Sequence, residues 1–249
     1  MARGRLTTVL LAALLLLESC AFTPPHRMDN RLFLDTADTA EWRSLLPTGM
    51  FHGVTCNPTL LERANETCTV TNLHKLAAEA LTYTNEFMCQ SWGSNSDEMY
   101  DNAMKISEPD RDNIVIKVPV TKEGTVAATR LQQSGVRICL TACYGSKQAL
   151  VAAGMGVEYI APYLGRMTDN GKDGFDECVK MQQIVDGLQA DTRILAASIR
   201  DAESLADLAV AGLDTFTFSP DVARQLFDEP LTVSAAEEFE RAAARGSQT

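Results

Sequence analysis

NIVIKVPVT, residues Asn113–Thr121, is the stretch that decides the fold. Aliphatic residues surround a single lysine, Lys117, and Pro119 follows it closely. A short, β-branched run that is apolar on both faces is typical of a strand in a parallel sheet that helices cover on each side. An ammonium group withdrawn from water is costly there unless it is paired or loses its proton. Lys117 therefore either snorkels from the strand end to water or is kept neutral so that it can attack a carbonyl group.

Similar runs recur on both sides of this stretch, and helical patterns separate them. Together with the stretch already quoted, these runs are, in chain order, RLFLDTA (31–37), HGVTCNP (52–58), EFMCQSW (86–92), NIVIKVPV (113–120), RICLTACY (137–144), YIAPYLGR (159–166), TRILAAS (192–198) and TFTFSP (215–220). Strands that alternate with helices such as 95–106 and 122–135 indicate βαβ units and a parallel sheet. Eight of them predict the α/β class and a single (β/α)8 TIM barrel, with an open doubly wound sheet as the alternative.

Two helix starts carry capping signals. Asp38 with Glu41 matches a capping box after the first strand. Ser234 with Glu237 matches another one beyond the eighth unit, and it predicts an extra C-terminal helix over residues 234–245. A helix that is additional to a barrel either forms an interface or closes the end of the barrel.

Composition narrows the class of partner. The chain has 249 residues, 45% of them hydrophobic, which is enough for one full core. Its formal net charge is −11 and its basic residues form no cluster, which argues against a nucleic-acid partner. A local pair of arginines can still hold one phosphate group against this overall charge. The three histidines (26, 52 and 74) lack ligand spacing, and no Walker loop is present, so no metal or nucleotide is expected.

The first residues have the pattern of a targeting segment. Arg3 and Arg5 precede an apolar stretch from Leu6 to Leu17, which is too short for an ordinary membrane span. We predict a signal or targeting presequence over residues 1–27 and a barrel domain over residues 28–249, with no membrane partner for the mature form. A secretory signal followed by cleavage before Phe22 resembles the bipartite presequences of complex plastids. The alternatives are a lipoprotein signal at Cys20, which fits less well, and a cytoplasmic protein whose translation starts at Met28.

Six cysteines lie beyond this segment and contain no C-x-x-C spacing. They are Cys56, Cys68, Cys89, Cys139, Cys143 and Cys178. We interpret them as buried, reduced thiols rather than as disulfides or metal ligands. A glycosylation sequon at Asn65 has meaning only if the chain passes through the secretory lumen.

Polar residues gather where the predicted strands end. They are Asp35, Thr55, Asn57, Gln90, Lys117, Thr141, Tyr163, Arg166, Ser198 and Arg200. The carboxyl ends of barrel strands and the loops after them form the active site of such folds. Alternation predicts that Val115, Lys117 and Pro119 share the inward face of one strand, and that Cys139, Thr141 and Cys143 share that of the next.

The segments LDTADT, GVTCNPTLL, IVIKVPVT, LTACY, APYLGR and AASIR resemble those of the transaldolase and fructose-6-phosphate aldolase family, in the same order. The resemblance covers residues 31–228 and implies class I, Schiff-base enzymes that need neither metal nor cofactor. It further implies sugar phosphates as small-molecule partners and a homo-oligomer, in which the terminal helix often packs on a neighbouring subunit.

The resemblance also implies roles for the polar residues. Lys117 would form an imine with the ketone carbon of fructose 6-phosphate, and apolar walls such as Val115 would favour its neutral form. Asp35 would handle the proton of a sugar hydroxyl. The remaining residues follow in the same way, with Asn57 and Thr55 beside the sugar hydroxyls, and Arg166, Ser198 and Arg200 on the phosphate. Alternatively, Asn57 only caps a helix before Pro58, and the two arginines form surface ion pairs.

The subtype stays open on the sequence. Gln90, Tyr163 and Ala161 resemble the fructose-6-phosphate aldolase type, in which the tyrosine, a water and Thr141 share proton transfer. Arg200 resembles the transaldolase type. The first would release free dihydroxyacetone, and the second would pass it to an aldehyde in the pentose phosphate pathway. A non-catalytic sugar-phosphate binder and a deoxyribose-phosphate type of aldolase are more distant alternatives, because the first has no use for Lys117 and the second needs another strand lysine.

Overall fold

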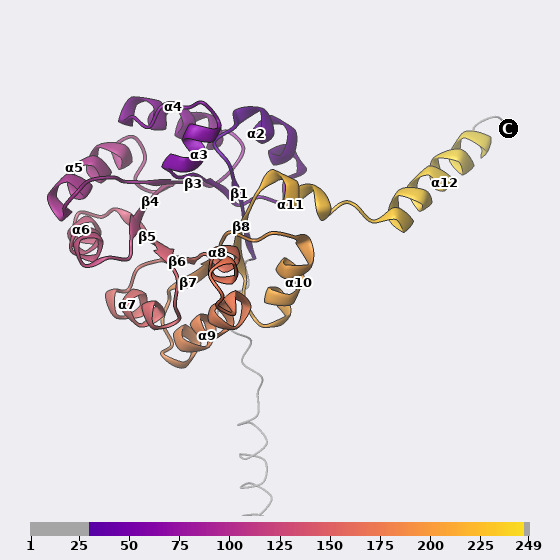
Figure 1. Ribbon diagram of the computed structural model, residues 1–249. Coiled ribbons are helices and arrows are strands. Elements are labelled where there is room, and N and C mark those ends of the chain that lie inside the picture. Colours follow the sequence, from indigo (N-terminus) through magenta and orange to yellow (C-terminus); the bar gives the residue numbers. More distant parts are fainter. Residues whose placement is uncertain (1–29, 247–249) are drawn as a thin grey trace, which may run out of the picture. The chain divides into compact units, whose positions relative to one another are not determined.

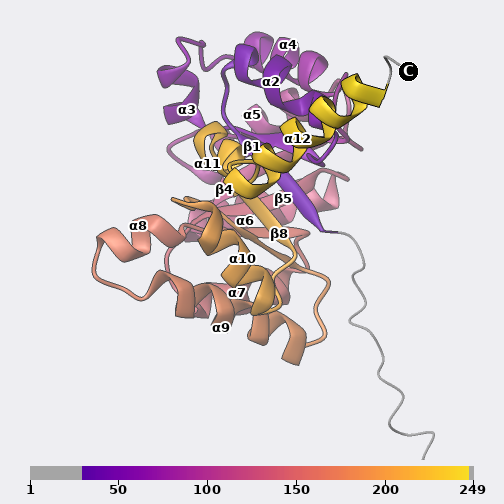
Figure 2. The ribbon, with the colours of Figure 1, turned by 90° about the vertical axis from the view of Figure 1, so that its right-hand side faces the viewer.

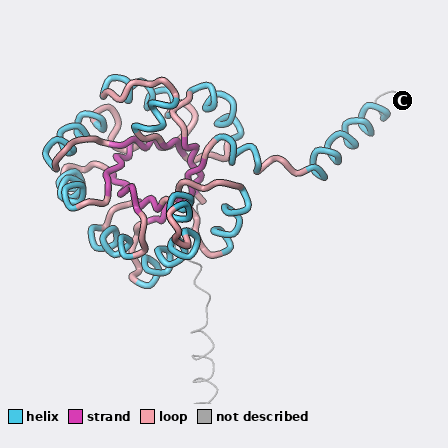
Figure 3. Tube along the Cα trace, in the orientation of Figure 1, coloured by secondary structure: helices cyan, strands magenta, loops and turns pink. Residues whose placement is uncertain are grey.

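Eight parallel strands close on themselves into a barrel, and helices surround them (Figures 1 and 3). The computed structural model describes residues 30–246. The strands are β1 (Arg31–Asp35), β2 (Gly53–Thr55), β3 (Glu86–Gln90), β4 (Ile114–Pro119), β5 (Arg137–Cys143), β6 (Tyr159–Pro162), β7 (Arg193–Ala196) and β8 (Thr215–Phe218). The barrel closes because β1 pairs with β8, Phe33 opposite Thr217. This confirms the predicted (β/α)8 barrel and excludes the open doubly wound sheet.

The helices follow the strands in turn. They are α2 (Thr39–Leu45), the 3-10 turn η2 (Leu46–Thr48), α3 (Pro58–Arg63), α4 (Val70–Ala80), α5 (Ser96–Ser107), α6 (Lys122–Gln133), α7 (Lys147–Met155), α8 (Leu164–Asp169), α9 (Gly174–Gly187), α10 (Ala202–Val210), α11 (Pro220–Gln225) and α12 (Pro230–Gly246). Asp38 caps α2 as predicted, since its carboxylate accepts the N–H of Ala40. Glu41 does not complete a capping box, because its carboxylate binds Arg224 instead.

The C-terminal helix α12 is longer than predicted. It begins at Pro230, and the Glu229 side chain accepts the N–H of Leu231 at 3.1 Å. Proline suits the first turn of a helix because its missing N–H would have no partner there. Ser234 therefore lies inside the helix, and its interpretation as an N-cap is wrong.

The hydrophobic core has two layers, one on each side of the sheet. The inner layer fills the barrel and consists of Phe33, Met88, Val115, Cys139, Tyr159, Ala161 and Leu195. The outer layer lies between the strands and the helices. Cys143 belongs to the outer layer, although alternation placed it inside with Cys139. The reason is an irregularity in β5 at Ala142, whose φ of 55° shifts the register and reverses the following side chain.

Buried charges occupy the end of the barrel where the strands begin. The Glu86 carboxylate accepts a hydrogen bond from Tyr159 at 2.9 Å and lies 2.5 Å from an Arg137 nitrogen and 3.4 Å from an Arg31 nitrogen. Burial alone would raise the pKa of Glu86, but hydrogen bonds and charges from His52 and Arg137 outweigh it and lower the pKa to about 2. A carboxyl group whose pKa is lowered by folding stabilises the folded state at every pH above its pKa in the unfolded chain. This stabilisation is lost as the pH falls from about 4.3 to about 2. The loss amounts to about 3 kcal/mol.

We expect Glu86→Gln to lower the free energy of unfolding at pH 7 by about 3 kcal/mol, because it removes a buried carboxylate that pairs with Arg31 and Arg137, which then keep only Glu158 as a shared partner among the described residues. Urea denaturation measures this directly. Glu79→Gln is the control, because Glu79 pairs with Arg43 in an exposed position. Such an ion pair contributes less than about 1 kcal/mol to the free energy of unfolding. Equal losses in the two variants would contradict a stabilising role for the buried cluster.

Two predictions concern features away from the barrel. The leader predicted over residues 1–27 lies outside the described residues, as do Cys20 and Phe22. Between residues 30 and 246, no helix has both the length and the apolar character that crossing a membrane requires.

Candidate active site

A cavity of about 380 Å³ opens at the end of the barrel where the strands finish. Most of the predicted site residues line it, namely Asp35, Asn57, Lys117, Tyr163, Arg166, Ser198 and Arg200. Thr55, Thr141 and Gln90 are not part of its lining. Figure 2 shows α3 and α8, the short helices after β2 and β6, projecting from the same end of the barrel. The cavity therefore lies at the end where TIM barrels carry their active sites.

Lys117 is a buried lysine whose amine faces this cavity. Only 3% of the residue is exposed, yet its side chain lines the cavity wall. Cys139 lies opposite it on β5 and Gln90 on β3. Among residues 30–246 no carboxylate lies within 4 Å of the amine, so Lys117 is not held in an ion pair. Snorkelling to bulk water does not describe this position, because the whole side chain is enclosed.

The surroundings of Lys117 favour its protonated form. Burial alone would lower the pKa of Lys117, but electrostatic interactions with Tyr163 and Asp35 act the other way. Smaller contributions come from Cys139 and Cys56, and the pKa lies above its ordinary value. The apolar walls act in the expected direction, since burial lowers this pKa, but in the resting protein the neighbouring groups outweigh them. A proton must leave this amine before it can act as a nucleophile.

Asp35 is oriented by a short chain of hydroxyl groups. The Thr55 hydroxyl donates to the Asp35 carboxylate at 2.6 Å. Thr55 also lies 2.6 Å from the Thr217 hydroxyl, and since its one proton is already used, Thr217 must be the donor. Thr55 is fully buried and its hydroxyl contacts Asp35, while its predicted contact with substrate stays a prediction.

Tyr163 and Thr141 form a second polar group beside the lysine. Their hydroxyl oxygens are 3.0 Å apart. The ring of Tyr163 packs edge-on against Tyr144, with centroids 5.5 Å apart. Hydroxyl groups at this distance can pass a proton between them. Thr141 is not part of the cavity lining, but it contacts Tyr163, which is.

Two guanidinium groups mark the wall formed by α8, which follows β6, and by the loop after β7. Arg200 pairs with Asp169 at 2.6 Å in an exposed position, and such a pair is worth little and is readily exchanged for another anion. Arg166 lies over the Tyr163 ring and donates to the Tyr144 hydroxyl at 3.4 Å. The predicted surface ion pair is thus present for Arg200, and both side chains still line the cavity.

Backbone contacts hold this wall together. The N–H of Gly165 donates to the carbonyl of Ser198 at 3.0 Å. A Cβ atom on Gly165 would lie 2.3 Å from that oxygen and 2.5 Å from the Arg200 side chain, so only glycine fits. Ser198 has a φ of 58°, an uncommon value for a residue other than glycine, and such backbone strain is found at functional sites.

Asn57 caps a helix, as one interpretation of the sequence had it, and its predicted contact with the sugar stays a prediction. Its side chain accepts the N–H of Leu60 at 3.1 Å and caps α3, and it also lines the cavity. An amide whose oxygen serves the cap still has its N–H₂ group to offer a ligand.

Sequence reasoning missed several residues that the structure places at the site. Thr217 and Gly165 support Asp35 and the arginine wall, and Arg63 at the end of α3 lines the cavity. The sequence could have indicated Thr217, because Thr215 and Thr217 are two residues apart on a short strand and therefore share one face of it. Arg63 carried no signal, since an arginine in the last turn of a helix is ordinary. Within residues 30–246, no three His, Cys, Asp or Glu side chains are grouped so that they could hold a metal ion.

Solved structures with a similar fold include the recombinant flavin-binding domain of baker's yeast flavocytochrome b2, with a TM-score of 0.55 and 10% identity. A mandelate oxidase mutant with an FMN adduct gives a TM-score of 0.52 and 13% identity. The matches cover 78% and 77% of this chain, and 58% and 65% of those chains. This chain thus spans less than two thirds of their length, and the likeness shows the barrel fold alone.

Sequence comparisons identify the family. A protein of Phenylobacterium zucineum named "Probable transaldolase" is 35% identical over 210 residues, and one of Chelativorans sp. with the same name is 36% identical over 217 residues. Each match covers 84% of this chain and 94% of the relative. The family model described as Transaldolase/Fructose-6-phosphate aldolase matches residues 32–248. The chain belongs to the transaldolase and fructose-6-phosphate aldolase family.

Proposed function

We propose that this protein cleaves the carbon chain of fructose 6-phosphate through an imine on Lys117. The observation that carries the proposal is the buried Lys117 amine, which faces a cavity also lined by Asp35 and by three guanidinium groups. A sugar-phosphate binder without catalytic activity would have no use for a lysine enclosed in this way. Nucleophilic catalysis by lysine requires this combination of enclosure and a nearby group that exchanges protons.

The proposed reaction uses the side chains in a fixed order. The neutral amine of Lys117 adds to the ketone carbon, and loss of water gives a protonated imine. Asp35 takes the proton from the sugar hydroxyl next to the breaking bond, whose electron pair moves toward the imine nitrogen. An aldehyde leaves, and a three-carbon enamine stays on Lys117. The enamine either adds to an acceptor aldehyde or takes a proton, and water then frees the lysine.

The residues that handle protons at the enamine bear on which of these two outcomes occurs. In this proposal Tyr163 and Thr141, whose hydroxyl oxygens are 3.0 Å apart, deliver a proton to the enamine or hold a water there. Gln90 has no carboxylate with which to activate that water, which favours the aldolase type and release of free dihydroxyacetone. The relatives named transaldolase favour transfer to an acceptor, as the pentose phosphate pathway requires. We propose the aldolase type, with transaldolase as the alternative.

The test is an assay of fructose 6-phosphate cleavage with and without erythrose 4-phosphate. Formation of glyceraldehyde 3-phosphate and free dihydroxyacetone in the absence of acceptor is the expected result. A strict need for the acceptor, with sedoheptulose 7-phosphate as product, would make the protein a transaldolase. No turnover in either assay would refute the imine proposal and favour a binding protein.

The phosphate group of the substrate is proposed to lie on Arg166, Ser198 and Arg200. Guanidinium groups match phosphate oxygens in geometry, and the Arg200 ion pair is exposed enough to be exchanged. We expect Gly165→Ala to raise the KM for fructose 6-phosphate by about tenfold or more, because its Cβ displaces Ser198 and Arg200. The control is Gly154→Ala, whose Cβ meets no atom within 4 Å. An unchanged KM in Gly165→Ala would remove this wall from the phosphate site.

We further propose that α12 mediates self-association. None of its described residues is buried, and Leu231, Val233 and Phe239 are 80%, 51% and 69% exposed. Large apolar side chains exposed on one helix mark a surface that another chain covers. Deleting residues 230–246 should reduce the mass measured by light scattering to that of a smaller species. An unchanged mass would place the subunit contact elsewhere.

A further inference from the structure

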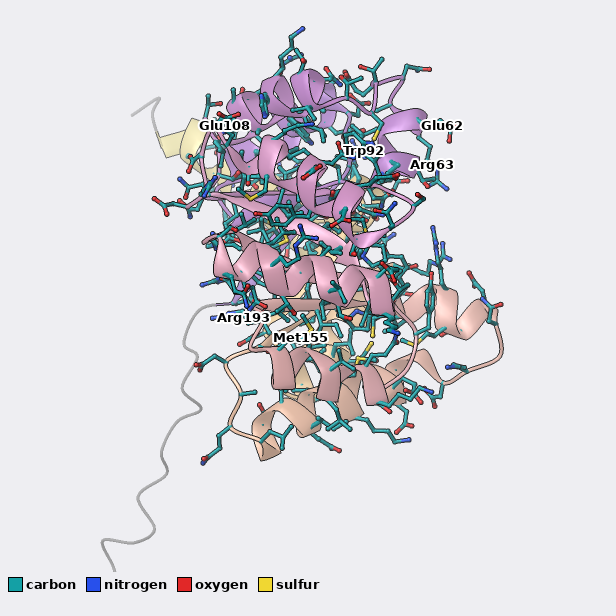
Figure 4. All side chains as sticks on the ribbon, turned by 90° about the vertical axis from the view of Figure 1, so that its left-hand side faces the viewer. Glu62, Arg63, Trp92, Glu108, Met155 and Arg193 are labelled. Atoms are coloured by element: carbon teal, nitrogen blue, oxygen red, sulfur yellow. The ribbon has the colours of Figure 1, made fainter. Side chains whose placement is uncertain are left out.

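One tyrosine just after β5 touches two parts of the proposed site, although it does not line the cavity. Tyr144 follows Cys143, the last residue of β5, and is absent from the cavity lining. Figure 4 shows Met155, the last residue of α7, toward the end of the barrel that carries Arg193, and Arg63 at the opposite end. Since α7 runs back from the end of β5, Tyr144 lies at the end that carries the cavity.

Tyr144 contacts the arginine of the phosphate wall and the tyrosine of the proton-transferring pair. Its hydroxyl oxygen accepts a hydrogen bond from the Arg166 guanidinium at 3.4 Å. Its ring packs edge-on against the ring of Tyr163, with centroids 5.5 Å apart. The guanidinium of Arg166 in turn lies 5.2 Å from the centroid of the Tyr163 ring. Each of these three side chains therefore contacts the other two, and Tyr144 is the one that lies outside the cavity lining.

Side chains hold the backbone of Tyr144 on both sides. Its N–H donates to the side-chain oxygen of Gln148 at 2.8 Å, and its carbonyl oxygen accepts from the ammonium group of Lys172 at 2.6 Å. Gln148 belongs to α7, and Lys172 lies in the connection between α8 and α9. Because three elements meet at this residue, its ring is held in place more firmly than the end of a strand alone would allow.

A left-handed residue before Tyr144 accounts for the position of its ring. Regular alternation from Thr141 would place Cys143 inside the barrel and direct Tyr144 toward the helices. Ala142, with a φ of 55°, interrupts this order, and Cys143 lies in the outer layer instead. The ring of Tyr144 still packs against that layer, and it also reaches Tyr163, which packs against the inner layer. A left-handed conformation is costly for alanine, and such strain is concentrated at functional sites.

We propose that Tyr144 is a positioning residue that orients Arg166 through its hydroxyl group and Tyr163 through its ring. The proposal rests on the proposed function, because Arg166 and Tyr163 take their roles in phosphate binding and proton transfer from it. A fixed acceptor at one edge of the guanidinium leaves its other N–H groups available for a phosphate. The hydroxyl of Tyr163 needs a fixed position as well, because a proton passes only between groups within hydrogen-bond reach. Tyr144 itself touches neither the sugar nor its phosphate.

The competing explanation is structural. An aromatic ring that packs at the end of a strand stabilises the fold by burying apolar area. That role predicts a lower melting temperature for any replacement of Tyr144, with KM and kcat unchanged. Two variants distinguish the explanations, since Tyr144→Phe removes only the hydroxyl group and Tyr144→Leu removes the ring as well.

The test measures initial rates with fructose 6-phosphate, together with thermal denaturation. Tyr144→Phe should raise KM by about three- to tenfold, as the loss of one hydrogen bond implies, and change kcat by less than about twofold. Tyr144→Leu should raise KM in the same way and also lower kcat by about tenfold or more, because Tyr163 loses the ring that aligns it. The control is Tyr100→Phe, which should leave both constants unchanged. Tyr100 lies outside the cavity lining, yet its ring also carries an arginine, Arg130, at 4.3 Å.

The outcomes separate this inference from the proposed function. A KM that Tyr144→Phe leaves unchanged, or a kcat that Tyr144→Leu leaves unchanged, overturns the positioning role and leaves the proposed chemistry standing. If the unmodified chain turns over no sugar, calorimetric titration with fructose 6-phosphate replaces the rates. Binding that Tyr144→Phe weakens by about three- to tenfold then sustains the hold on Arg166 and refutes the chemistry alone. Binding that this substitution leaves unchanged, or the absence of binding, overturns both proposals.

Discussion

Replacing Lys117 by Met is expected to lower turnover of fructose 6-phosphate by more than about 10⁴-fold, because it removes the only nucleophile that the mechanism employs. The thioether has a similar length and suits an enclosed site, so the fold should survive. Because the raised pKa means that the charged amine stabilises the folded state at neutral pH, its removal should lower the melting temperature slightly. Initial rates and thermal denaturation, followed by circular dichroism, measure the two effects.

Lys122→Met is the matched control for this loss. Lys122 is exposed at the start of α6 and is not part of the cavity lining. Its replacement should change turnover by less than about twofold. Turnover that persists in Lys117→Met within tenfold of the original would remove Lys117 from the reaction, provided that the variant is folded.

Asp35→Asn is expected to separate imine formation from bond cleavage. Loss of the general acid–base group should lower turnover by about 10²–10⁴-fold. The Asp35 charge also raises the pKa of Lys117, so its removal should lower that pKa and supply more neutral amine at a given pH. Reductive trapping of the imine should therefore reach its half-maximal rate at a lower pH in the variant, while turnover falls.

Asp221→Asn provides the comparison within the same cavity. Asp221 lines the cavity, but its side chain is 92% exposed and pairs with Arg224 at 3.2 Å. Its removal should shift the pH dependence of trapping by only a small amount, because water screens its charge. A pH profile that moves equally in both variants, or in neither, would contradict the coupling of Asp35 to Lys117.

Regular patterns made the barrel predictable from the sequence. The apolar runs and the intervening helical stretches recur often enough that few other topologies can accommodate them, and the carboxyl ends of parallel strands must meet at one end. That rule alone brings Asp35, Lys117 and Tyr163 together. The predicted inward direction of Lys117 and Cys139 also holds, because both lie on uninterrupted parts of their strands.

Features that depend on local irregularity or on several neighbours were not predictable. Alternation placed Cys143 inside the barrel, but a single left-handed residue, Ala142, reverses the side chain. The pKa of Lys117 reflects a balance between burial and neighbouring negative charges, and a strand pattern reports only the burial. Cys68 was expected to be buried and is exposed, because it lies in the connection before α4. Arg63 could be assigned to the cavity only once α3 was seen beside it.

The measurement that tests the central claim most directly is borohydride reduction of the full chain with fructose 6-phosphate, followed by peptide mass spectrometry. The account predicts a reduced sugar adduct on the peptide that contains Lys117 and no adduct in Lys117→Met. It also predicts that the amount of adduct rises with pH, since the pKa of this amine is raised. An adduct on a different lysine, or turnover without any adduct, would contradict the account.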